Sequence, residues 1–114
     1  MRFSQATISA ILAAAAVEAR TFAVLRFNGK NGLTTGRMDP IVNPGGPSGH
    51  SHSIQGGNAF ALDMTNDDPL KSTCTTAKIK NDKSNYWTPT LYFQDPKTGQ
   101  LESVEMFYMN VYYL

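Results

Sequence analysis

The chain has 114 residues, and its ten basic and nine acidic side chains leave it with a net charge of +1. A chain so close to neutrality, without a clustered basic patch, is not typical of proteins that bind nucleic acid or anionic membranes. We therefore expect neither nucleic acid nor a membrane among its partners.

Residues 1–19 have the pattern of a secretory signal peptide. Arg2 supplies a positive charge and the uninterrupted apolar stretch 6–17 follows it. Val17 and Ala19 then place small side chains at the two positions that a signal peptidase must accommodate. This order of a charged, an apolar and a cleavable region predicts export.

We predict cleavage between Ala19 and Arg20, which leaves 20–114 as one small domain. The alternative is a buried amino-terminal helix, but such a helix would normally carry a polar face. The apolar run is also shorter than the roughly 20 residues that span a bilayer, so it does not predict a membrane anchor. We expect a secreted protein, extracellular or in a cell wall.

The front half of this domain shows one clear strand and much turn sequence. Residues 21–27 are β-prone and stop at Asn28-Gly29, which predicts a first strand. Residues 28–36 are predicted to form a turn-rich connection. In 41–57, prolines and glycines are so dense that they disfavour both a helix and a central strand. We expect a shaped loop that flanks a short extended piece.

The next segments are polar. Residues 66–76 permit one helical turn, because Pro69 can occupy a first-turn position. Residues 78–85 are charged and are expected to be exposed.

The last third has the strongest strand pattern. Residues 87–94 and 103–113 are rich in aromatic and β-branched side chains, and the turn sequence 95–99 separates them. They are predicted to form an antiparallel hairpin. Both faces of 103–113 are largely apolar, and such a strand is normally covered rather than left as an edge. We therefore expect the chain to be a truncated, front part of a larger domain.

These elements predict an all-β fold. Strand patterns recur with turn residues between them, and no helix of the mature chain is expected to exceed a turn or two. The expected architecture is a partial β-sandwich, two packed sheets of which this chain holds one part.

Two histidines stand out in the glycine-rich segment. His50 and His52 have the spacing that places both imidazoles on the same side of an extended segment, where they could bind one metal ion or act as an acid/base pair. Asp39 is the nearest candidate for a third group, since zinc and copper sites need further ligands. The alternative is that both histidines bond to loop carbonyls and only hold the segment in shape.

Several aromatic side chains could contact a ligand. Tyr86, Trp87 and Tyr92 are of the kind that stacks on sugar rings. The neighbouring polar side chains that could bond to sugar hydroxyls are Asp82, Lys83 and Asn85. The alternative is core packing, because aromatic side chains in strands are more often buried than displayed.

The sequence gives little support to other kinds of catalytic or binding site. A copper histidine brace needs an amino-terminal histidine, whereas the predicted mature chain begins at Arg20. The glycine-rich segment lacks the Lys-Ser/Thr pair of a phosphate loop, and no serine has a Gly-x-Ser-x-Gly context. The carboxylates show no pairing at a defined spacing, and no cofactor is implied.

Cys74 is the one cysteine of the sequence, although small exported domains commonly rely on disulfides. It is therefore either a free thiol or half of a disulfide whose partner lies elsewhere.

Two long motifs carry a resemblance to a known family. They are RMDPIVNPGGPSGHSHSIQGG at 37–57 and DKSNYWTP at 82–89. With the segments around them, they make 20–113 resemble the amino-terminal part of a fungal secreted family, the domain of unknown function numbered 1996 (DUF1996). The resemblance implies export, a fungal source and a β-rich domain, but no activity.

The resemblance also bears on the chain's end and its cysteine. Family members continue beyond the position that matches Leu114, which implies that this chain is the front part of the domain. Many relatives carry a second cysteine where this chain has Ala77. The resemblance thus implies that Cys74 pairs with a cysteine outside this chain.

Two classes of function remain open. The first is a secreted carbohydrate-active protein that binds or cleaves a polysaccharide of a cell wall or plant, with His50, His52, Tyr86 and Trp87 at its site. The second is a non-catalytic extracellular or cell-wall structural protein, in which the histidines only brace the loop.

Overall fold

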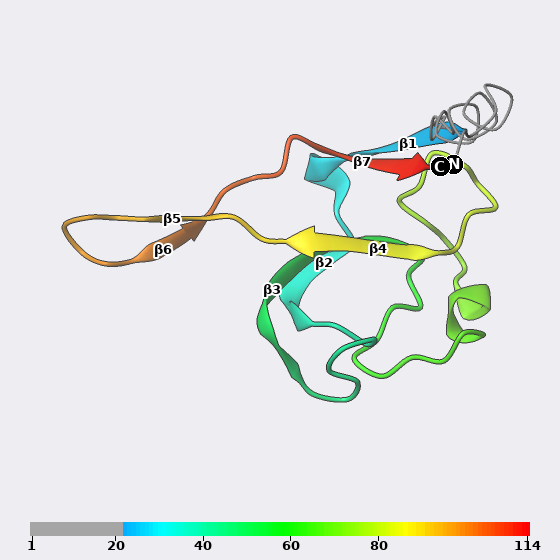
Figure 1. Cartoon of the computed structure of the whole chain (residues 1–114), viewed down its shortest axis with the longest axis horizontal. Helices are drawn as coiled ribbons and strands as arrows, with labels where there is room; N and C mark the ends of the chain where they lie inside the picture. Colours follow the sequence, from blue (N-terminus) through cyan, green and yellow to red (C-terminus); the bar gives the residue numbers. More distant parts are fainter. Residues whose placement is uncertain (1–21) are drawn as a thin grey trace, which may run out of the picture.

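The computed structural model describes residues 22–114 (Figure 1). The predicted signal peptide and its cleavage site lie outside these residues. The described part holds seven strands and two short 3-10 helices, so the all-β prediction is confirmed. No helix in this part is long and apolar enough to cross a membrane.

A three-stranded antiparallel sheet forms the middle of the molecule. It consists of β2 (Thr34–Met38), β3 (Pro47–Gly56) and β4 (Asn85–Pro89), with β3 in the centre. The prediction that the glycine-rich segment excludes a central strand was therefore wrong. Pro47 stands at the first position of β3, where a missing N–H is tolerated. The turn-rich connection expected at 28–36 was partly wrong too, because β2 begins there.

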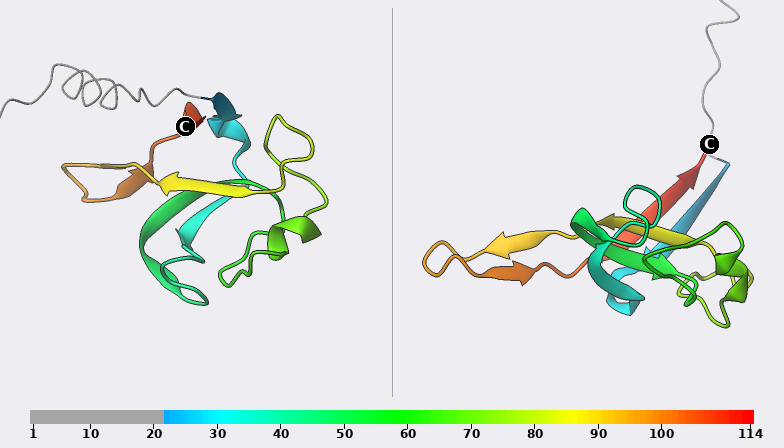
Figure 2. Two further views of the ribbon diagram at one scale, coloured as in Figure 1. Left: turned by 45° about the vertical axis from the view of Figure 1, so that its right-hand side comes forward. Right: turned by 90° about the horizontal axis from the view of Figure 1, so that it is seen from below.

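A second, two-stranded sheet lies beside one face of the first (Figure 2). It pairs β1 (Ala23–Asn28), the predicted first strand, with β7 (Tyr108–Tyr113) in antiparallel register. The main hydrophobic cluster sits between the two sheets. Its buried members are Leu25, Phe27, Ala77 and Met109, against which Tyr86, Met106 and Val111 pack. This packing of two sheets is the partial sandwich that the strand pattern predicted.

The third sheet is a hairpin that projects from the rest of the molecule (Figures 1 and 2). It pairs β5 (Tyr92–Gln94) with β6 (Leu101–Ser103). The turn between them was predicted correctly: Asp95 Oδ1 accepts the backbone N–H groups of Lys97 and Thr98, at 2.7 and 3.0 Å. Gly99 completes the turn at a φ of +71°, where glycine is favoured.

The hairpin is much shorter than the sequence predicts. Residues 85–89 pair with β3, and residues 108–113 pair with β1, so the two predicted strands separate soon after the turn. The reason is burial. All six residues of β5 and β6 are exposed, whereas pairing elsewhere places Tyr86 of β4 and Met109 of β7 against the hydrophobic cluster between the sheets.

Two short helical turns complete the described chain. η1 (Gly29–Asn31) follows β1, and the Asn28 side chain accepts the Lys30 backbone N–H at its start. η2 (Asp68–Lys71) carries Pro69 in its first turn and confirms the single turn predicted for this polar segment. Of the segment 78–85, predicted to be exposed, 78–81 are exposed and Asp82 is half-buried.

Candidate functional site

The predicted metal ligands and the only tryptophan of the sequence lie on one face of the three-stranded sheet. They are His50, His52 and Trp87. Ile54 lies opposite Trp87 in the register of β3 and β4, and directly opposed residues share a face. His52 lies two residues before Ile54 on the same strand and therefore shares that face. We call it the Trp87 face.

A cleft of about 260 Å³ opens on this face beside Trp87. It lies between the loop that joins β2 to β3 and the segment that leads into η2. Its lining combines apolar side chains with amides and hydroxyls: Pro40, Ile41, Met64, Thr65, Asn66, Pro69, Ser84, Asn85 and Trp87. Phe60 packs behind the indole, with ring centroids 5.9 Å apart.

Asp39 shapes the first wall of the cleft. Its Oδ1 accepts the backbone N–H groups of Ile41 and Val42, at 3.1 and 3.0 Å. This turn fixes the position of Ile41 in the cleft. The N–H of Val42 lowers the pKa of the Asp39 carboxyl, and so do the N–H of Ile41 and the charges of His52 and His50 when these are protonated.

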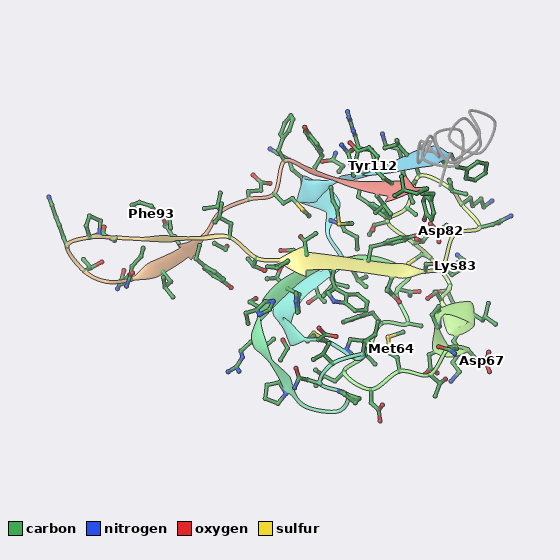
Figure 3. All side chains as sticks on the ribbon, viewed as in Figure 1. Met64, Asp67, Asp82, Lys83, Phe93 and Tyr112 are labelled. Carbon is green, nitrogen blue, oxygen red and sulfur yellow. The ribbon has the colours of Figure 1, made fainter. Side chains whose placement is uncertain are left out.

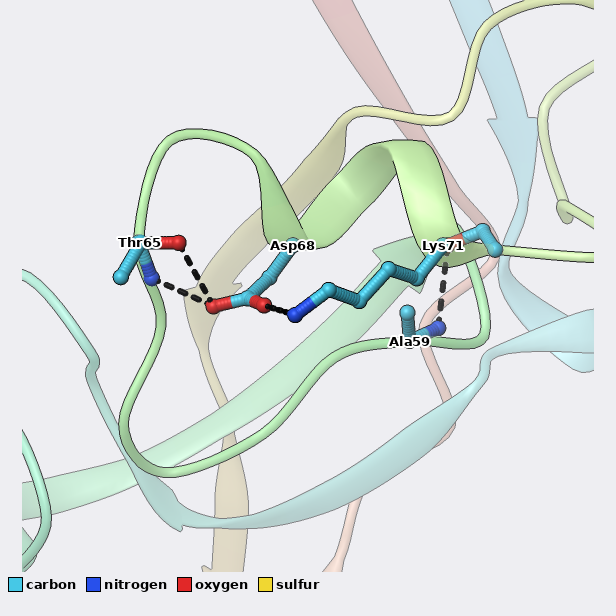
Figure 4. A network of polar contacts seen from close by, with 5 residues as sticks. Ala59, Thr65, Asp68 and Lys71 are labelled. Carbon is cyan, nitrogen blue, oxygen red and sulfur yellow. Dashed lines mark hydrogen bonds and ion pairs between the residues drawn. The ribbon is translucent and has the colours of Figure 1, made fainter.

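Asp68 shapes the second wall (Figure 4). Its Oδ2 accepts the backbone N–H and the hydroxyl of Thr65, at 2.6 and 3.0 Å, while the Lys71 ammonium group pairs with Oδ1. The bond from Lys71, followed by those from Thr65, lowers the pKa of Asp68 to about 2. The network holds Thr65 beside Pro69, and both residues line the cleft.

The two histidines lie together, as their spacing predicted. Their rings meet edge to face with centroids 4.5 Å apart. His52 is buried, with 4% of its surface exposed, and its Nδ1 is 2.8 Å from the carbonyl oxygen of Met38. His50 is exposed. The structure thus brings His50, His52 and Asp39 to one region. The bracing alternative is met only by His52, and its carbonyl partner belongs to the last residue of β2 instead of a loop.

The predicted aromatic site is divided. Tyr86 points to the opposite face from Trp87 and packs on Phe27, with ring centroids 4.9 Å apart. Its hydroxyl donates to Asp82 Oδ2 at 2.9 Å and lies 2.6 Å from the Tyr113 hydroxyl. Burial, together with these bonds, raises the pKa of Tyr86 well above its usual range. Tyr86 and Asp82 therefore belong to the packing between the sheets and not to the cleft.

Other candidates lie apart from the cleft. Tyr92 stands on the projecting β5–β6 hairpin, as does Phe93, well away from Met64 of the cleft (Figure 3). Cys74 is exposed, and no disulfide forms among residues 22–114. Its pairing with a cysteine outside this chain stays a prediction.

Most of the cleft was not predicted from the sequence. Trp87 and Asn85 were candidates, but Ile41, Met64 and Asn66 come from loops that no motif connects. A second hollow, of about 310 Å³, lies on the opposite face near Ser53 and Thr90. None of the residues that line it is aromatic. We place the candidate site at Trp87 because that cleft combines an aromatic wall with polar groups.

Residues 39–114 match the sequence model of a family described as Domain of unknown function (DUF1996). The chain belongs to this family. The matched residues begin at Asp39 and include both histidines, Cys74 and Trp87, so the family region contains the whole lining of the cleft. Neither a curated protein nor a solved structure matches the chain.

Proposed function

We propose that this chain is an exported protein that binds a polysaccharide of a cell wall or plant in the cleft beside Trp87. The observation that carries the proposal is the lining of that cleft, where the indole of Trp87 lies with the amide of Asn66 and the hydroxyls of Thr65 and Ser84. The amino-terminal signal pattern supports export.

This combination suits a sugar. A pyranose ring has apolar C–H faces that pack on an aromatic side chain, and hydroxyls around its edge that need hydrogen-bond partners. Side-chain amides can both donate and accept, and so can hydroxyls, which lets them bond to sugar hydroxyls in either sense. A largely apolar pocket with a few placed polar groups is also the usual form of a small-ligand site.

The same lining favours binding over cleavage. None of the described residues that line the cleft is a carboxylic acid, histidine, lysine or cysteine. Hydrolysis of a glycosidic bond generally needs a pair of carboxyl groups flanking that bond. The nearest acidic groups, Asp39 and Asp68, accept hydrogen bonds that hold the walls of the cleft. We therefore assign them positioning roles.

Tryptophan fluorescence tests the proposal directly, because Trp87 is the only tryptophan of the chain. Soluble oligosaccharides from chitin, β-1,3-glucan, cellulose and xylan should be titrated against the full chain. We expect at least one of them to change the emission in a saturable way. Co-sedimentation with the matching insoluble polysaccharide provides a second measurement that does not depend on the indole.

Variants then locate the binding. Trp87→Ala should weaken co-sedimentation at least about tenfold, as expected when a central aromatic anchor is truncated. Asn66→Ala, at an exposed position of the lining, should weaken it without affecting folding. Tyr92→Ala is the matched control, since this tyrosine is an exposed aromatic outside the cleft. No emission change with any of the four sugars, or equal binding by all variants, would contradict the proposal.

A non-catalytic structural role is the second candidate. It is favoured by the bond between His52 Nδ1 and the Met38 carbonyl, which braces the glycine-rich segment without a ligand. In that case the chain should show no saturable sugar binding, while His52→Ala should still lower its melting temperature.

A further inference from the structure

His50 and His52 form a pair of neighbouring imidazoles, of which one is buried and the other is exposed. They alternate along β3, and their rings are in edge-to-face contact with centroids 4.5 Å apart. His52 is buried and held in place, whereas His50 is exposed and its side chain can rotate. One fixed and one adjustable imidazole on the same face can converge on a single point.

The Met38 carbonyl sets the tautomer of His52. A carbonyl oxygen can only accept a hydrogen bond, so His52 Nδ1, at 2.8 Å, must carry the proton. In the neutral ring the lone pair is then on Nε2, for which no hydrogen bond is found within the described chain. Within 22–114, the buried side-chain atoms that lack a partner are Gln55 Nε2 and Asn85 Oδ1. The lone pair of His52 Nε2 likewise has no hydrogen-bond partner among the described residues.

This arrangement is the one that metal-binding histidines use. Such a histidine generally donates its other ring N–H to a backbone carbonyl or carboxylate, which fixes the ring and increases its basicity. Asp39 adds a negative charge nearby, and its Oδ2 accepts no hydrogen bond from the described residues, since both turn bonds go to Oδ1. The negative charge of Asp39 therefore favours a cation near the two imidazoles.

We propose that His50 and His52 chelate one divalent late transition-metal ion, for which Cu²⁺ has the highest affinity, with water in the remaining positions. Among residues 22–114 no group of three or more His, Cys, Asp or Glu side chains is placed to hold a metal. A closed tetrahedral zinc site is thus not what this chain provides. Two nitrogens and water oxygens suit the tetragonal geometry of Cu²⁺, which also stands highest in the order of divalent affinities.

The metal site would be separate from the sugar cleft but on the same face. His52 precedes Ile54 by two residues, and Ile54 is the register partner of Trp87. Two residues of a strand span about 7 Å. A paramagnetic ion bound at the histidines should therefore quench the fluorescence of Trp87, whether or not a sugar binds.

The experiment uses the full chain without an affinity tag, because these are its only two histidines. Cu²⁺ binding is measured by calorimetry and by quenching of Trp87, and the nitrogen ligands are counted by electron paramagnetic resonance. His50→Gln is the main variant, since it changes an exposed side chain and should leave the fold intact. Cys74→Ser controls for copper bound by the free thiol.

We expect one Cu²⁺ per chain, coordinated by two imidazole nitrogens. His50→Gln should weaken binding by more than about tenfold, the lower bound seen when even a supporting contact of a metal site is lost. It should leave a single imidazole, while Cys74→Ser should change nothing. The proposal is overturned if His50→Gln binds Cu²⁺ as tightly as the wild type, or if Cys74→Ser abolishes the binding.

Discussion

Tyr86 and Trp87 are consecutive residues of β4, yet their side chains serve opposite faces of the same sheet. Tyr86 packs on Phe27 in the core between the sheets, and Trp87 packs on Phe60 beside the cleft. Alternation along a strand requires this separation. A change at one residue should therefore affect stability, and a change at its neighbour should affect the ligand site.

Tyr86→Phe tests the first half of this relationship. The variant keeps the ring on Phe27 but removes the hydroxyl that bonds to Asp82 and Tyr113. We expect the free energy of unfolding in urea to fall by about 1 kcal/mol, the usual net value of such hydrogen bonds. Sugar binding should be unchanged. Tyr112→Phe, on the exposed face of β7, is the control and should have an effect within about 0.5 kcal/mol.

The two histidines should differ in their effect on stability. His52→Ala removes a buried ring and leaves the Met38 carbonyl without its donor, which we expect to cost about 2 kcal/mol of unfolding free energy. His50→Ala alters an exposed side chain and should cost less than about 0.5 kcal/mol. Thermal and urea unfolding of both variants, without added metal, check this. Equal losses in the two would show that Met38 does not anchor His52.

Local patterns in the sequence predicted the elements that local contacts determine. The turn at Asp95 and Gly99 forms from bonds among its own residues, and η2 forms because Pro69 suits a first turn. The first strand, β1, likewise follows from its own residues. The alternation of His50 and His52 placed both rings on one side for the same reason.

Local sequence patterns could not predict how strands far apart in the sequence pair with one another. β1 pairs with β7, and Arg26 bonds to Asn110, 84 residues further along the chain. The strong aromatic pattern of the last third suggested one long hairpin, because adjacent strands with a turn between them usually pair. Instead, β7 pairs with β1 and β4 pairs with β3, because these pairings bury their apolar side chains. The cleft was missed for a similar reason, since Ile41 and Asn66 meet only after both loops have folded.

The loop around η2 should respond to acid in a specific way. The folded-state pKa of Asp68 is lowered to about 2, from an ordinary value of 3.8. A lowered pKa means that the ionised carboxylate stabilises the fold above about pH 4, and that this contribution is lost as the pH falls from 4 towards 2. Asp68→Asn should therefore lower the melting temperature at pH 6, and by much less at pH 2.

A neighbouring residue controls this comparison. Asp67 is exposed and its side chain makes no capping bond to η2, so Asp67→Asn should have little effect at either pH. Added salt should also reduce the effect of Asp68→Asn at pH 6, because Lys71 is largely exposed and its charge is screened. A difference between wild type and Asp68→Asn that is as large at pH 2 as at pH 6 would show that charge is not its cause.

Gly56, at the end of β3, should be the least replaceable glycine of the central strand. Its φ of +105° is rarely adopted by other residues, and a Cβ there would overlap the carbonyl oxygen of Ser84. We expect Gly56→Ala to destabilise the protein by at least about 2 kcal/mol, because strain and a backbone clash act together. Gly49→Ala, in the same strand with open space around it, should be tolerated. Gly45→Ala separates backbone strain from the clash, since Gly45 has a φ of +72° but no atoms near the position of a Cβ. In urea unfolding, its loss of unfolding free energy should lie between those of Gly49→Ala and Gly56→Ala.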